Sequence, residues 1–141
     1  MPTVSLETIM LLLRIAFVAG AVTDGLAVIP MLSRRIGIAL VGGDSSRDKM
    51  EYRFAWGVGA ALMAGWTLLL LWGAMSPLMR RDILLLTVFP VIAGIVLATV
   101  IAAHRGLVSV ARMVPLWIHL GTVSFFYILV YVLSIPFVQS S

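Results

Sequence analysis

Residues 83–103 read ILLLTVFPVIAGIVLATVIAA, a stretch of 21 residues without a charge. The hydrocarbon core of a bilayer is about 30 Å thick, and a helix needs about 20 apolar residues to cross it. Three more stretches meet this requirement, with expected bounds of 6–32, 54–75 and 113–138. The sequence therefore predicts an all-α fold in which residues 1–141 form a single transmembrane domain with four membrane helices.

The composition of the whole chain agrees with a membrane protein. Hydrophobic residues make up 62% of the 141 residues and charged residues only 11%, about half the charged fraction of a soluble domain. The chain has no cysteine, which excludes disulfides and thiolate metal sites. Its net charge of +4 does not indicate nucleic-acid binding, because no helix face combines basic and aromatic residues.

The connections between the expected helices are short. They cover residues 33–53, 76–82 and 104–112. Short connections make successive helices antiparallel neighbours, so we expect an up-down-up-down four-helix bundle. The longest connection holds a Gly-Gly-Asp-Ser-Ser cluster at 42–46, typical of a turn. The preceding apolar stretch, 36–43, is too short to span a membrane and suits its interface.

Positive charges predict the orientation of the helices. Lys and Arg concentrate in cytoplasmic connections of membrane proteins. Seven lie in the first and third connections and two in the second: Arg34, Arg35, Arg47, Lys49, Arg53, Arg105 and Arg112, against Arg80 and Arg81. We therefore expect the first and third connections to be cytoplasmic and both termini to lie outside.

Small residues recur every four positions on three of the expected helices. The stripes are Ala16–Gly20–Asp24, Gly57–Ala61–Gly65 and Pro90–Gly94–Ala98–Ala102. Such stripes let membrane helices approach one another closely. We expect helix contacts within the bundle, the alternative being that one stripe docks a partner subunit.

Two ionisable residues lie at similar depth in neighbouring expected helices. Asp24 lies about 12 Å and His119 about 9 Å from the cytoplasmic end, at 1.5 Å per residue. We expect them to face each other, directly or through water, with Thr23 and Thr122 nearby. A carboxylate and an imidazole can share a proton, which indicates a proton-linked or ligand-binding site. The alternative is a polar cross-link that fixes the helix register.

Arg14 lies in the opposite half of the membrane, about 15 Å from Asp24 along the same helix. It can snorkel to the outer interface or reach Glu7. Tyr127, Tyr131 and Ser134 share one face of the last helix at its depth. Elsewhere in the spans, the indole N–H of Trp66 needs an acceptor, and Pro90 is expected to kink the third helix.

Four basic residues ring the expected cytoplasmic mouth: Arg53, His104, Arg105 and Arg112. Such a ring can collect an anionic head group or a phosphate. The alternative is that these charges only set the topology. No phosphate-binding loop, zinc-protease helix or paired-carboxylate motif is present in the sequence, so we expect no cofactor, no metal and no catalytic residue.

Two stretches resemble a family of small four-helix prokaryotic integral membrane proteins. They are residues 65–94, GWTLLLLWGAMSPLMRRDILLLTVFPVIAG, and residues 19–32, AGAVTDGLAVIPML. The resemblance covers about half of the chain. It implies four helices in a prokaryotic plasma membrane and no known activity.

Three classes of function follow from these features. The first is a non-enzymatic accessory or small binding protein that associates with itself or with a larger membrane complex. The second is a proton-coupled transporter that works as an oligomer through Asp24 and His119. The third is a lipid-binding or lipid-modifying membrane protein.

Overall fold

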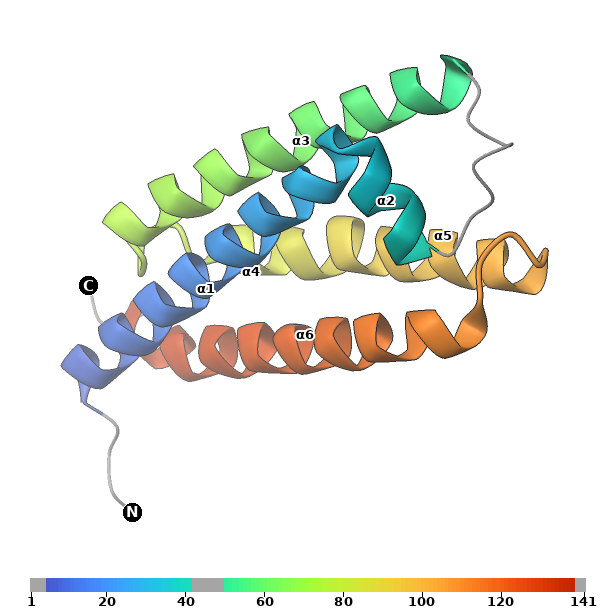
Figure 1. The fold of residues 1–141 in the computed structure, drawn as a ribbon. Coiled ribbons are helices and arrows are strands. Elements are labelled where there is room, and N and C mark those ends of the chain that lie inside the picture. Colours follow the sequence, from blue (N-terminus) through green and yellow to red (C-terminus); the bar gives the residue numbers. More distant parts are fainter. Residues whose placement is uncertain (1–4, 42–49, 139–141) are drawn as a thin grey trace.

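The computed structural model describes residues 5–41 and 50–138 (Figure 1). The predicted turn at 42–46, the charges of Arg47 and Lys49 and the side chain of Arg34 lie outside this description. Within it the chain forms helices and turns and no strand. The helices are α1 (Leu6–Leu32), α2 (Arg34–Val41), α3 (Met50–Met75), α4 (Asp82–Leu86), the π-helix η2 (Thr87–Ile92), α5 (Ala93–His104) and α6 (Val110–Val138).

Four helical stretches are long and apolar enough to cross a membrane, as the sequence predicts. They are Leu6–Leu32, Arg53–Met75, Asp82–His104 and Val110–Phe137. Four such helices are consistent with a helical membrane protein. Helices α3 and α6 each begin a few residues before the expected starts at 54 and 113. Helical hydrogen bonding continues past the apolar stretch, whereas hydropathy marks only the part that suits hydrocarbon.

Helix α1 begins at a conventional cap and runs alongside α3. The Ser5 hydroxyl accepts a hydrogen bond from the Thr8 N–H at 3.2 Å, which satisfies a free donor of the first turn. Three close approaches then follow one another along the pair. Phe17 lies over Gly73, Leu70 beside Gly20, and Met31 against Gly59. Because rising numbers on α1 meet falling numbers on α3, the two helices run in opposite directions.

The hydrophobic core fills one half of the bundle, which we call the packed half. Its buried residues come from α1, α3, α4, η2 and α6: Ile9, Leu13, Ala16, Phe17, Ala21, Leu70, Ile83, Leu84, Val88, Tyr127 and Val130. The turn between α3 and α4 closes this end and buries Pro77.

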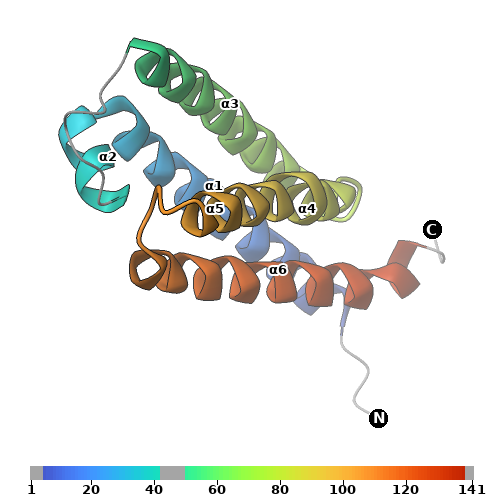
Figure 2. The ribbon, with the colours of Figure 1, turned by 90° about the vertical axis from the view of Figure 1, so that its right-hand side faces the viewer.

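The other half, which contains α2 and α5, is much less enclosed, and we call it the α2 half. Figures 1 and 2 show α1 and α3 diverging from α5 and α6 toward the end occupied by α2. Helix α5 has no buried residue, and α1 has none after Ala21. Helix α2 bridges the divergence: Gly37 packs against Trp56, and Arg112 of α6 donates to the Ala39 carbonyl at 3.1 Å.

Pro90 interrupts the third span as a π-helical turn. Proline has no N–H, so the carbonyl four residues earlier, that of Leu86, would lose its donor in an α-helix. A π register pairs residues five apart and lets the next N–H, that of Val91, serve this carbonyl. The Ala93 N–H shows the same spacing in its bond to the Val88 carbonyl. The turn thereby keeps the backbone bonded where no water is at hand.

Two of the three small-residue stripes do not lie between helices. Ala16 and Gly20 are buried, as expected. Gly57, Ala61 and Gly65 are exposed on α3, and Gly94 and Ala98 are exposed on the third span. A methyl group added at Gly57, Gly65 or Gly94 would meet nothing within 4 Å. The expectation that these two stripes pack inside the bundle is therefore wrong for this chain on its own.

Candidate functional site

Asp24 stands where the packed half gives way to the α2 half. It lies one turn beyond Gly20, the last small residue of the buried stripe on α1, and its side chain is partly buried. Its Oδ2 atom is buried and has no hydrogen-bond partner in the described part of the chain. The neighbouring Thr23 hydroxyl donates to the Ala19 carbonyl of its own helix at 2.9 Å. A buried carboxylate oxygen without a donor is costly, which makes Asp24 the strongest candidate in the spans.

His119 lies on the face of α6 that leads toward the core. It shares the i, i+4, i+7, i+11 stripe with Val123, Phe126 and Val130, all of which contact or belong to the core cluster. His119 lies one turn before Val123, the first residue of this stripe that packs on the core, and its side chain is exposed. The structure joins no atom of His119 to Asp24 by a hydrogen bond. Asp24 and His119 each lie at the end of a packed stripe, where the α2 half begins. That they face each other through water or a ligand stays a prediction.

Thr122 is not part of the same face. Its side chain is exposed, and its hydroxyl donates to the Ile118 carbonyl one turn back at 2.9 Å. This bond within one helix satisfies the hydroxyl without any partner helix. The structure therefore gives Thr122 no place beside Asp24.

Tyr127 is the residue near Asp24 that the sequence analysis did not assign to this site. Its side chain is fully buried, and a methyl group at Gly20 would overlap its hydroxyl. Gly20 lies one turn before Asp24 on the same face of α1, so the Tyr127 hydroxyl packs on the side of α1 that leads to Asp24. The sequence did contain a signal for this contact. Gly20 lies one turn before Asp24, and Tyr127 is an aromatic residue at a similar depth on the last helix.

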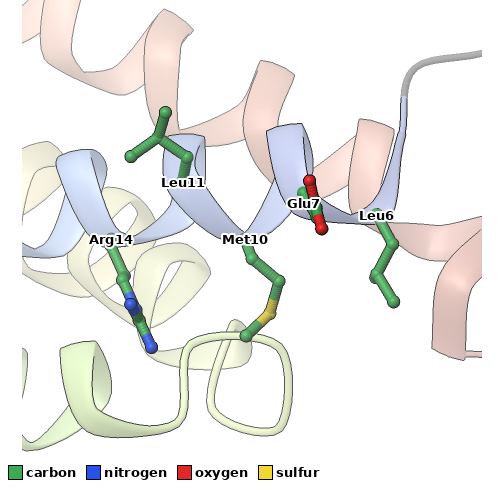
Figure 3. Close-up of a pocket in the computed structure, with 5 residues that line it drawn as sticks. All are labelled: Leu6, Glu7, Met10, Leu11 and Arg14. Carbon is green, nitrogen blue, oxygen red and sulfur yellow. The ribbon is translucent and has the colours of Figure 1, made fainter.

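Arg14 lies on the outer side of α1, apart from the aromatic face of α6. It is exposed and lines a shallow hollow of about 370 Å³ together with Leu6, Glu7, Met10 and Leu11 (Figure 3). All five residues come from the first three turns of one helix. Its exposure agrees with the expectation that Arg14 snorkels, and Arg14 forms no hydrogen bond with the face of Tyr131 and Ser134 at the same depth on α6.

Arg81, from the turn between α3 and α4, occupies that face instead. Its guanidinium donates to the Ser134 hydroxyl at 3.2 Å and stands over the Tyr131 ring, 5.0 Å from the centroid. Its neighbour Arg80 stacks on Trp72, 3.5 Å from the ring centroid, and donates to the Trp72 carbonyl. Both arginines of this turn are thus engaged with the ends of membrane helices.

The four basic residues expected at the mouth all lie at the α2 end and are exposed. They are Arg53, His104, Arg105 and Arg112. Gly106, with a φ of +66°, makes the turn that follows His104 and Arg105. Arg112 is already bonded to α2, so its role is at least partly structural.

Two tryptophans in the spans find hydroxyl acceptors. Trp66 donates to Thr87 at 3.1 Å, as its depth requires, and Trp117 donates to Thr99 at 2.9 Å. The Thr87 hydroxyl in turn donates a hydrogen bond to the Ile83 carbonyl of its own helix. These bonds tie α3 to η2 and α6 to α5, and they leave no polar group of the four side chains for chemistry.

The candidate site thus reduces to Asp24, with Tyr127 packed one turn away at Gly20 and with His119 as a predicted partner. No group of three or more metal-ligating side chains occurs in residues 5–41 and 50–138 as far as they are described. Comparison of the chain with protein-family models, with curated proteins and with solved structures finds no match.

Proposed function

We propose that this chain is a small, non-enzymatic membrane binding protein that receives a polar group of a partner or ligand at Asp24. Its four spans run up-down-up-down in a plasma membrane, with the α2 end in the cytoplasm and both termini outside. The excess of Lys and Arg in the first and third connections supports this orientation.

The observation that carries the proposal is the buried, unpartnered Oδ2 atom of Asp24. Insertion scales place the cost of a carboxylate at a helix centre at roughly 3 kcal/mol. A donor from outside the chain would relieve that cost. The α2 half offers a route to it, because α5 has no buried residue and α1 has none beyond Ala21.

A second copy or a larger membrane complex is the natural source of such a donor. The exposed stripe Gly57–Ala61–Gly65 on α3 supports this, because close helix contact in lipid favours small residues. Crosslinking in native membranes tests the idea. We expect adducts of a defined larger mass for the unaltered chain and their loss in Asp24→Leu, with Phe125→Leu as a control at an exposed site. A protein that is monomeric in every membrane preparation would contradict this proposal.

Proton-coupled transport by an oligomer is the second candidate. The positions of Asp24 and His119 favour it, since Asp24 lies one turn after the buried Gly20 of α1 and His119 lies one turn before Val123, which packs on the core. Asp24→Asn should abolish pH-dependent uptake into reconstituted vesicles, and Thr122→Val should leave it unchanged. Equal flux in Asp24→Asn and the unaltered chain would eliminate this candidate.

Lipid binding at the α2 end is the third candidate. The exposure of His104 and Arg105 beside the Gly106 turn favours it. Lipids retained through purification and identified by mass spectrometry would separate it from the others. Arg105→Gln should reduce retention of anionic lipid, and unchanged retention would count against it.

A further inference from the structure

Two charged side chains, Glu7 and Arg14, lie on α1 at the end of the molecule opposite α2. These two charges are seven residues apart, or about 10 Å along α1. Figure 3 shows them with Leu6, Met10 and Leu11 as the lining of one hollow of about 370 Å³. Glu7 and Arg14 form no ion pair with each other. One helix face therefore carries a cation and an anion, separated by apolar side chains.

The depth of the two charges in a membrane follows from the length of α1. Its 27 residues span about 40 Å, about 10 Å more than the hydrocarbon core. When the helix is centred, about 5 Å protrudes at each end, so Glu7 lies in the head-group region. The Arg14 backbone lies about 7 Å inside the hydrocarbon, within reach of the boundary for a long side chain. A guanidinium at this level can reach lipid phosphates at the boundary and is stabilised by them.

The order of the charges along α1 matches the head group of one lipid class. In a zwitterionic phospholipid the phosphate is close to the hydrocarbon and the ammonium lies farther out. Arg14 is the deeper charge and suits the phosphate, because a guanidinium binds phosphate oxygens with paired hydrogen bonds. Glu7 is the outer charge and suits an ammonium. The spacing of about 10 Å leaves room for a phosphoethanolamine group between the two side chains.

We propose that Glu7 and Arg14 form a binding site for a phospholipid whose head group ends in a primary ammonium, such as phosphatidylethanolamine. The acyl chains would follow the exposed apolar side chains of Leu6 and Leu11. A choline head group has no N–H to donate to the carboxylate, and a glycerol head group has no positive charge. Both should therefore bind more weakly. The site is independent of Asp24 and of the proposed function.

Native mass spectrometry of the full chain in detergent tests the proposal. The probes are phosphatidylethanolamine, phosphatidylcholine and phosphatidylglycerol with the same acyl chains. We expect the first to bind about fivefold or more tightly than the others, since charge-assisted hydrogen bonds are the stronger kind. Arg14→Gln should weaken its binding about tenfold. Glu7→Gln should remove the preference for ethanolamine over choline.

Three further variants separate lipid recognition from misfolding and from a general effect of charge. Arg35→Gln, which alters an exposed arginine of α2 at the opposite end, should leave the preference unchanged. Arg14→Lys keeps the positive charge but loses the paired hydrogen bonds, so its binding should fall between that of the unaltered chain and that of Arg14→Gln. This intermediate loss decides the question if Arg14→Gln does not fold. The double variant Glu7→Arg, Arg14→Glu keeps both charges but reverses their order, and it should lose the preference. Equal binding of the three lipids by the unaltered chain, or an unchanged preference in the reversed variant, would overturn the proposal.

Discussion

The packed half and the α2 half of this molecule treat their polar groups in opposite ways. In the packed half, the Trp66 indole has Thr87 as its acceptor, and Arg81 binds Ser134. In the α2 half, the Asp24 Oδ2 atom has no partner in the described chain, and His119 is exposed. Helices alone in lipid gain little from burying apolar surface, so close packing and satisfied polar groups hold the packed half together. The comparison shows that the packed half pairs these polar groups within the chain, whereas the α2 half keeps a buried carboxylate oxygen without a partner in the described residues.

A pair of phenylalanines gives the largest expected contrast between the halves. Phe17 is 0% exposed against Gly73, whereas Phe54, near the start of α3 at the α2 end, is 76% exposed. Phe17→Ala should lower the free energy of unfolding by about 3–5 kcal/mol, the usual cost of a cavity of this size. Phe54→Ala should change it by less than about 0.5 kcal/mol. Unfolding in mixed micelles, followed by tryptophan fluorescence, measures both. Equal losses would show that the two halves are packed alike.

The contact of Gly20 with Tyr127 gives the next largest effect. A methyl group at Gly20 would overlap the Tyr127 hydroxyl, so Gly20→Ala should cost about 1–3 kcal/mol of stability. Tyr127→Phe removes the overlapping atom and should recover much of the loss in the double variant. Gly121→Ala, where the added methyl meets nothing, is the control and should be neutral or slightly stabilising. Additive losses in the double variant would refute the close contact.

The hydrogen bond between Trp66 and Thr87 gives a smaller effect. Thr87→Val removes the acceptor of the Trp66 N–H and should cost about 1 kcal/mol, near the upper range for hydrogen bonds between membrane helices. Thr122→Val removes a hydroxyl bonded only within α6 and should cost less. The tryptophan emission should also shift in Thr87→Val alone. A larger loss in Thr122→Val would assign the important hydroxyl to the α2 half.

Arg81 gives the smallest expected effect. Arg81→Gln loses the bond to Ser134 and the contact with the Tyr131 ring, and should cost about 0.5–1 kcal/mol. The exposed Arg105 is the matched residue of the α2 half, and Arg105→Gln should leave the free energy of unfolding unchanged within error. The same unfolding measurement in low and high salt compares them. A greater loss in Arg105→Gln would reverse the order of the two halves.

Hydropathy was sufficient to predict the four apolar helices, because length and absence of charge are properties of each stretch alone. It was not sufficient to assign contacts. The stripe of Gly57, Ala61 and Gly65 has the spacing of a contact face, but spacing does not say which neighbour, if any, lies against it. In this chain the α1 contacts of α3 fall at Gly59, Leu70 and Gly73 instead.

The candidate site was predictable to the same degree. Asp24 was identifiable because an acid in a span is costly wherever it points. Its relation to Tyr127 depends on the crossing of α1 and α6 at Gly20, which no local pattern encodes. Likewise, the spacing of Tyr131 and Ser134 shows that they share a face of the last helix, but it does not identify the residue that contacts them. Arg81 reaches them because the turn after α3 brings it to the end of α6.

The π-turn at Thr87–Ile92 has a consequence for helical phase. A π-turn holds one residue more than the α-helical turn it replaces. The helix beyond it therefore points its side chains in the same directions as if that residue were absent. A wheel drawn at 100° per residue therefore misplaces every side chain of α5 by about 100°. Counting in fours from Pro90 to Gly94 and Ala98 joins positions that belong to two different azimuths. Removing one residue within 87–92 would restore a continuous α-helix without turning α5, whereas removing one after Ile92 would rotate the remainder of α5 about its axis.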